Sequence, residues 1–233
     1  VAANTMGTII HDTLDVLYQP FIGEFITKES IKEMLNKVED LVLYYFKKHF
    51  HSSDVYTGKN RLIFEISKDY INRFLAIEID SLQENDVLKI IATEQDLEAT
   101  ITIDEFDFPI KLRGQVDRID QLNGVTRIID YKTGNVTAAN LKVSDISVIG
   151  EEKYSKAIQV LLYAFLYSQN FETKELEGGI ISFKNLKGGF LKVDFGKKDH
   201  EISSEKIDEF LISIKNLIKE IFNPEIPFTE KLH

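Results

Sequence analysis

Two aspartates and a lysine, Asp117, Asp130 and Lys132, occur in the stretch GQVDRIDQLNGVTRIIDYKTG, which spans residues 114–134. Carboxylates that face each other repel unless something neutralises their charge, and a divalent cation does so. Carboxylate oxygens suit Mg²⁺ or Mn²⁺, and a lysine beside such an ion can orient or deprotonate a bound water and stabilise charge on a phosphate. If the fold brings these residues together, their types indicate metal-dependent hydrolysis of a phosphodiester.

The pair Asn123-Gly124 predicts how the two aspartates meet. Asn-Gly between alternating apolar and polar residues is typical of a two-residue hairpin, because both central positions of a type I′ turn need a positive φ. Counting back equally along the two strands places Asp117 opposite Asp130, with Cβ atoms about 5 Å apart.

The same register makes sense at other positions. It places Asp120 opposite Arg127, a favourable charge pair, and Ile119 opposite Ile128, an apolar pair. The register is therefore supported by residues that have no part in the proposed chemistry.

The side-chain alternation of a strand puts Asp130 and Lys132 on one face and Tyr131 on the other. Gln115 then faces Lys132 from the partner strand. A simpler interpretation remains open, in which the two acids face solvent near a turn and each pairs with a nearby arginine or lysine.

The elements that must position these residues begin with helices. Apolar residues recur at a helical period in MGTIIHDTLDVLY, where His11 and Asp15 lie one turn apart. Ser30 and Glu33 form a capping-box pattern that predicts the start of a second helix. The helices expected in this part of the chain span residues 6–18, 30–49 and 68–82.

From residue 87 onward, β-branched alternation replaces the helical period. We expect strands at residues 99–103, 108–120 and 125–133, a helix at 151–170, strands at 176–183 and 190–195, and a last helix from Ser203 or Ser204 to about Phe222. This order predicts an α/β domain with a mixed sheet. We expect one domain over residues 1–233, with a helical part at 1–86, a catalytic core at 87–200, and a terminal helix and tail at 201–233.

The segments GQVDRID, DYKTG and QVLLY follow one another between residues 114 and 163. In this order they resemble the motifs of the PD-(D/E)xK nuclease superfamily, and in particular its RecB-like and AddB-like branch. The resemblance implies a restriction-endonuclease-like αβββαβ core flanked by helices. Members of this branch also carry a histidine in a G-x-x-x-H context on an upstream helix, which the segment GTIIH matches.

The resemblance also implies roles for individual residues. The implied metal ligands are His11, Asp117, Asp130 and the backbone carbonyl of Tyr131; the implied catalytic residues are Asp117, Asp130 and Lys132; and Gln159 and Tyr163, four apart on one helical face, are implied to contact the substrate. Structural alternatives stay open: a helical histidine is often a capping group, and Gln159 and Tyr163 could border an apolar stripe. Glu94, in the segment ATEQDL, could supply a further acid, but we expect it to be a plain charge at a strand edge.

The bulk composition bounds the function further. The 233 residues contain no cysteine, so we expect no iron–sulfur cluster, although some relatives carry one. With 28 basic and 38 acidic residues the net charge is -10, so binding of DNA needs local cations rather than a basic face. No apolar run approaches the roughly 20 residues that span a bilayer, and we expect a cytoplasmic protein. The chain starts with valine, and we expect it to be a fragment of a longer protein.

Together these features predict a Mg²⁺- or Mn²⁺-dependent DNA nuclease, expected to be an exonuclease and the nuclease module of a helicase-nuclease or of a repair and recombination protein. The resemblance implies DNA as a partner and a helicase domain or subunit as another. A non-catalytic nucleic-acid-binding or scaffold domain with the same fold is the alternative. A retaining glycosidase also needs two carboxylates about 5 Å apart, but the nearby lysine and the absence of tryptophan for sugar stacking argue against it.

Overall fold

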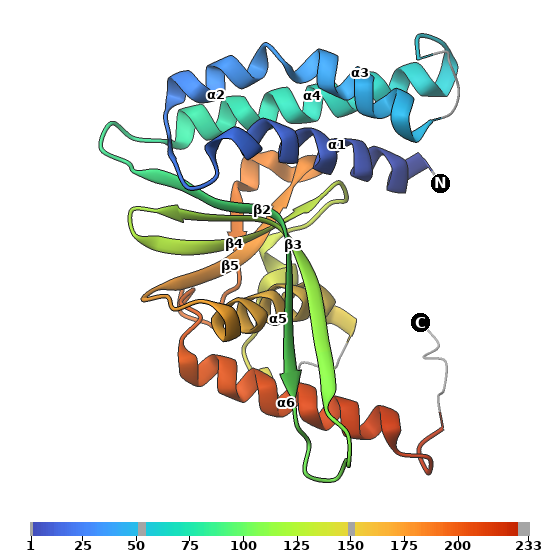
Figure 1. Ribbon diagram of the computed structural model, residues 1–233, viewed down its shortest axis with the longest axis vertical. Helices are drawn as coiled ribbons and strands as arrows, with labels where there is room; N and C mark the ends of the chain where they lie inside the picture. Colours follow the sequence, from blue (N-terminus) through green and yellow to red (C-terminus); the bar gives the residue numbers. More distant parts are fainter. Residues whose placement is uncertain (1, 51–54, 149–151, 228–233) are drawn as a thin grey trace.

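The computed structural model describes residues 2–50, 55–148 and 152–227 (Figure 1). Its centre is a six-stranded sheet in which the strands lie side by side in chain order. The fourth and fifth strands are parallel, and each of the other neighbouring pairs is antiparallel. The strands are β1 (Phe25–Ile26), β2 (Leu88–Ile101), β3 (Ile110–Leu122), β4 (Val125–Lys132), β5 (Leu176–Ser182) and β6 (Phe190–Lys192).

Helices cover both faces of the sheet (Figure 1). The helices that precede β2 form a layer on one face, and the two later helices lie on the other, with one of them between the sheet and the last helix. The first group comprises α1 (Ala2–Tyr18), α2 (Lys28–Leu35), α3 (Val38–His49) and α4 (Gly58–Ser81), and the second comprises α5 (Ser155–Asn170) and α6 (Ser204–Phe222). The predicted mixed α/β class, with its N-terminal helical segment, is confirmed.

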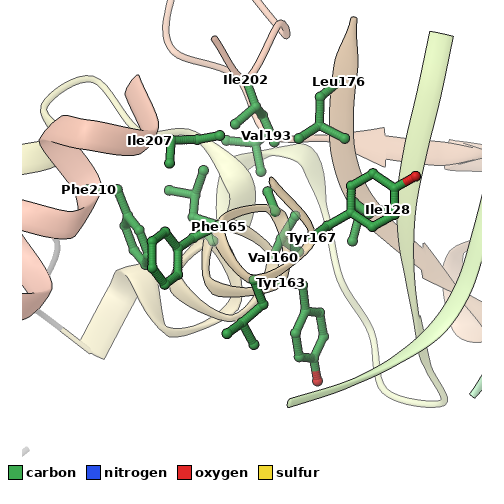
Figure 2. Packing of buried hydrophobic residues seen from close by; sticks show 14 of the residues in the cluster. Ile128, Val160, Tyr163, Phe165, Tyr167, Leu176, Val193, Ile202, Ile207 and Phe210 are labelled. Atoms are coloured by element: carbon green, nitrogen blue, oxygen red, sulfur yellow. The ribbon is translucent and has the colours of Figure 1, made fainter. Parts of the chain in front are cut away.

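Each helical layer has its own apolar core, and β4 contributes to both. Ile128 packs with α5 and α6, whereas Ile129 and Tyr131 pack with α1 and α4. Figure 2 shows the first of these cores, where Phe165 of α5 meets Phe210 of α6. Because successive side chains of β4 enter opposite cores, the backbone at Asp130 to Lys132 is held from both sides.

The hairpin between β3 and β4 is confirmed. Asn123 and Gly124 have φ values of 54° and 92°, as a type I′ turn requires. The pairs Asp120↔Arg127 and Ile119↔Ile128 occur as predicted.

The helix boundaries differ from the prediction in the first third of the chain. The second helix is capped by Thr27, whose hydroxyl accepts a hydrogen bond from the backbone N–H of Ser30, so Ser30 is not the cap. The helix predicted to run on to His49 is broken at Asn36 into α2 and α3. Asparagine competes with the helix by favouring turns, and the Lys37 N–H bonds the Met34 carbonyl at this break. The third helix begins at Gly58, ten residues before the predicted start.

Later elements agree more closely. The first strand after residue 87 is longer than predicted and contains a bulge between Ile90 and Ala92. The helix predicted over 151–170 begins at Ser155, behind a 3-10 turn at Glu152–Tyr154, while residues 149–151 lie outside the described residues. The last helix begins at Ser204 with Ser203 as its N-cap. The last six residues of the predicted tail also lie outside the described residues.

Candidate active site

The site lies where β3 and β4 part. Their ladder ends with Arg118↔Ile129, so it contains neither Asp117↔Asp130 nor Gln115↔Lys132, and on this point the predicted register extends too far. Asp117 is instead turned toward the backbone of β4, where its Oδ2 accepts a hydrogen bond of 2.5 Å from the N–H of Tyr131. The two aspartates are neighbours through this bond rather than as a facing pair of the ladder.

Helix α1 brings His11 to Asp117. The Nδ1 atom of His11 lies 3.3 Å from Oδ1 of Asp117 and 3.6 Å from Oε1 of Glu94. One ligand atom from each of these three side chains lies within 4.8 Å of the other two. The imidazole and two carboxylates therefore form a compact donor set of the kind that Mn²⁺ or Mg²⁺ can use.

Of the two interpretations of Glu94, a plain charge at a strand edge was preferred over a further acid of the site, and this preference is wrong. Its carboxylate faces His11, and its neighbours Thr93 and Gln95 pair with Arg118 and Val116 of β3, which flank Asp117. Glu94 has a φ of 45°, an uncommon backbone conformation for a residue other than glycine. The signal that could have revealed Glu94 is the β2–β3 register, but the connection over residues 102–109 has no two-residue turn motif to fix it.

The charges within this set interact strongly. Burial on its own lowers the pKa of His11, but hydrogen bonds to Asp117 and Glu94 outweigh it and raise the pKa to about 10. A proton on His11 thus offsets part of the negative charge of the two acids. Because a metal ion binds the neutral imidazole, an ion at this place would take over that role from the proton.

Asp130 and Lys132 form an ion pair beside this set. The ammonium Nζ of Lys132 lies 2.9 Å from Oδ1 and 2.8 Å from Oδ2 of Asp130. The Asp130 carboxyl is 2% exposed, and the Lys132 side chain is 32% exposed. Burial and the charge of Asp117 raise the pKa of Asp130 to about 6, although Lys132 opposes the shift. Lys132 therefore reaches the surface while tied to a buried acid.

The Tyr131 side chain anchors the backbone of β4 between Asp130 and Lys132. Its ring is buried against Phe74 and Phe183 and lies 6.0 Å from the ring of His11, edge on. The Tyr131 backbone, whose carbonyl is an implied ligand, is thus fixed by packing on one side and by Asp117 on the other.

Helix α5 borders the site with Gln159 and Tyr163. The Gln159 amide donates a hydrogen bond of 2.8 Å to the Tyr163 hydroxyl. Burial raises the pKa of Tyr163, the hydrogen bond from Gln159 opposes this, and the charges of Asp130 and Asp117 add to the rise. In Figure 2 the Tyr163 ring points away from Val193 and Ile202. The two residues are therefore joined to each other, on the side of α5 that is close to the acids.

Glycine at position 114 has a steric cause. A Cβ at this position would lie 2.7 Å from Cε1 of Tyr163, closer than side chains approach one another. The first residue of the GQVDRID motif therefore lets α5 lie against β3. The loop after Lys132 is also clamped: the Ser182 hydroxyl donates to the Gly134 carbonyl at 2.8 Å and accepts from the Val136 N–H at 3.1 Å.

Arg118, next to Asp117, is part of a buried charge network. Its side chain is fully buried and forms ion pairs of 2.7 Å with Glu78 of α4 and with Asp120. Its guanidinium carbon lies 4.4 Å from the centre of the Tyr18 ring of α1. Asp120 also pairs with Arg127 at 2.6 Å, as the sequence predicted. The network joins α1 and α4 to β3 at Arg118, the residue beside Asp117.

Two hollows of the surface are lined by residues other than His11, Glu94 and Asp117. A cavity of about 200 Å³ between α4 and the sheet is lined by Glu78 and Arg127 among apolar residues, and none of the predicted site residues lines it. A shallow groove along β2 and β3 is lined by Asp96, Leu97, Glu98, Arg113, Gly114 and Gln115. This groove adjoins the site through Gln115, whose amide donates to the Glu94 carbonyl at 3.3 Å.

A family model of the PD-(D/E)XK nuclease superfamily matches residues 1–233. The chain belongs to this superfamily, whose members hydrolyse nucleic acids with divalent metal ions. No curated protein and no solved structure matches the chain. None of the helices in residues 2–50, 55–148 and 152–227 has the length and hydrophobicity of a membrane-spanning segment.

Proposed function

We propose that this chain is a Mg²⁺- or Mn²⁺-dependent deoxyribonuclease that acts as an exonuclease. The observation that carries the proposal is the convergence of His11, Glu94 and Asp117, with ligand atoms within 4.8 Å of one another, beside the Asp130–Lys132 ion pair. A scaffold has no physical need for this arrangement, because gathering acids around a buried site destabilises a fold unless a cation repays it.

The residues divide into a metal-holding set and a set that meets the substrate. His11, Glu94 and Asp117 would hold the ion, and Asp130 and the Tyr131 carbonyl would be its further ligands. When bound, the ion supplies Lewis-acid polarisation of the phosphate and lowers the pKa of water.

Lys132 contributes a positive charge at the rim of the site. Its partner Asp130 holds the ammonium in place, and the exposed part of its side chain is accessible to a phosphate. In this position the ammonium orients the attacking water and offsets the negative charge that develops on the phosphate. Gln159 and Tyr163 offer an amide and a hydroxyl to the nucleic-acid backbone from the other side.

The motif order GQVDRID, DYKTG and QVLLY supports a RecB-like nuclease module. We therefore propose that residues 1–233 form one nuclease domain of a cytoplasmic helicase-nuclease or of a repair and recombination protein, with DNA as substrate and a helicase domain or subunit as partner. The net charge of -10 requires that such a partner, or local cations such as Lys132, supply the attraction to DNA.

The experiment is cleavage of end-labelled single- and double-stranded DNA with Mn²⁺, Mg²⁺ or a chelator. We expect metal-dependent cleavage that Lys132→Ala reduces at least about 100-fold, as loss of a group acting on the water would. The matched control is Lys174→Ala, an exposed lysine in the connection from α5 to β5. Undiminished cleavage by Lys132→Ala would contradict the proposed mechanism.

Closed circular single-stranded DNA tests the exonuclease assignment, because it has no ends. We expect it to survive under conditions that degrade the linear form. Cleavage of the circle would show an endonuclease. If the chain binds DNA but cleaves no form of it, with or without metal, the scaffold alternative holds instead.

A further inference from the structure

Helix α1 contacts the candidate active site at two successive residues of β2. His11 approaches Glu94, and one helical turn later Asp15 Oδ1 accepts a hydrogen bond of 2.5 Å from the Thr93 hydroxyl. Residues four apart share a helical face, so both contacts come from the side of α1 that lies on the sheet. Thr93 is 8% exposed, so this bond is largely shielded from water.

The position of Glu94 needs such a restraint. Its φ of 45° places it in a region that is unfavourable for a residue with a side chain and persists only where the surroundings enforce it. The β2–β3 pairing resumes on either side, at Thr93↔Arg118 and Gln95↔Val116. From the β3 side, the Gln115 amide bonds the Glu94 carbonyl. From the α1 side, the neighbouring restraint is Asp15 on Thr93.

We propose that Asp15 is a positioning residue, which holds α1 against β2 so that His11 and Glu94 keep their spacing around one metal ion. The inference rests on the proposed function, because the spacing matters only if these residues bind an ion. A hydrogen bond to an ionised carboxylate is among the stronger ones in a protein, which suits Asp15 to this task. Asp15 also accepts a hydrogen bond of 3.3 Å from Gln19 of the 3-10 turn Gln19–Phe21, which directly follows α1, and this bond does not reach β2.

Asp12 provides a matched comparison on the same helix. It is adjacent to His11 in the chain, but its Oδ2 lies 2.7 Å from Nε2 of His49 and so fastens α1 to α3. Both aspartates hold α1 in place, and only the Asp15 contact ends on the strand that carries Glu94. A role that merely docks the helix predicts similar effects from both positions, whereas a positioning role predicts an effect on metal binding from Asp15 alone.

The test measures Mn²⁺ binding by calorimetry, the Mn²⁺ dependence of cleavage, and the melting temperature. For Asp15→Ala we expect the Kd for Mn²⁺ to rise at least about tenfold, as for loss of other groups that orient a ligand, with the KM for DNA unchanged. Asp15→Asn should restore the Kd to within about threefold, because its amide oxygen still accepts from Thr93. Asp12→Ala should leave the Kd unchanged at a comparable loss of melting temperature.

A second pair of variants tests the same hydrogen bond from its other partner, in case Asp15→Ala misfolds. Thr93→Val removes the hydroxyl and keeps the shape, and Thr93→Ser keeps the hydroxyl. Thr93→Val should weaken Mn²⁺ binding as Asp15→Ala does, and Thr93→Ser should not. Equal shifts for Asp12→Ala and Asp15→Ala, or an unchanged Kd in Asp15→Ala and Thr93→Val, would overturn the inference. A wild-type chain that binds no Mn²⁺ would instead overturn the proposed function itself.

Discussion

Asp117 is the residue at which three elements of the site meet. It lies on β3, contacts His11 of α1 and accepts the N–H of Tyr131 from β4. Glu94 adds a second carboxylate from β2, so the negative charge exceeds what one protonated histidine offsets. The side chains therefore form an incomplete site unless a cation joins them.

Gly114 gives a prediction at the scale of one residue. Gly114→Ala places a methyl group 2.7 Å from Cε1 of Tyr163, so α5 or the ring must move. We expect a loss of about 1–3 kcal/mol in the free energy of unfolding, typical of overpacking, and reduced cleavage because Tyr163 is displaced. Urea unfolding and a cleavage assay measure the two effects.

The control for Gly114→Ala is a double-mutant cycle with Tyr163→Ala. The cost of the added methyl should largely disappear when the ring is absent, because the two sites are in contact. If the effects of the two substitutions on stability are additive, contact with the Tyr163 ring is not the reason why position 114 requires glycine.

Helix α1 and strands β2 and β3 behave as one unit at the scale of elements. His11, Asp15 and Tyr18 lie on the sheet-facing side of the helix at intervals of four and three residues, and each contacts a strand or its arginine. Arg118 binds this unit to α4 through Glu78. The candidate active site thus depends on a buried network of ion pairs centred on Arg118, the residue next to Asp117.

Arg118→Met tests that dependence. Removing the guanidinium leaves Glu78 and Asp120 buried with a lost partner, so we expect a loss of about 3–5 kcal/mol in the free energy of unfolding. Urea unfolding measures it. Arg73→Met is the control, since Arg73 pairs with Asp69 on an exposed helical surface and should cost less than about 0.5 kcal/mol. A loss below about 1 kcal/mol for Arg118→Met would contradict the structural role of the network.

The strands and helices around the site show how much of the structure could be predicted from the sequence. The β3–β4 register was predictable near the turn because Asn123-Gly124 fixes it locally. The end of this register at Arg118↔Ile129 was not predictable, because the point at which the two strands separate depends on packing by both helical layers. Glu94 was not assigned to the site for a related reason: its approach to His11 needs a long β2–β3 connection and the docking of α1, and neither leaves a short-range signal. The N-cap at Thr27 and the helix break at Asn36 are local turn features. Tertiary packing determines at which of several possible residues such a helix begins or ends.

At the scale of the whole molecule, the proposed metal ligands come from separate parts of the chain. His11, Glu94 and Asp117 are distant in sequence, so the unfolded chain has no preformed site. Metal binding should therefore stabilise the fold by mass action, by about 2.7 kcal/mol at an ion concentration one hundred times the Kd. We expect the melting temperature to rise with Mn²⁺ and to return to its starting value with chelator.

Glu94→Gln should weaken this stabilisation by Mn²⁺ strongly, and so should Asp117→Asn. Glu98→Gln is the matched control, since Glu98 lies on the same strand but pairs with Lys111 at the surface. A rise in melting temperature that is the same in wild type, Glu94→Gln and Asp117→Asn would show that the ions act elsewhere on the acidic surface.

The most direct test of the central claim is anomalous diffraction from a crystal of the protein soaked in Mn²⁺. We expect a manganese peak within bonding distance of His11 Nδ1 and of a carboxylate oxygen from both Glu94 and Asp117, with Lys132 beside it. Clear peaks at other places on the surface, with none between these three side chains, would contradict the claim.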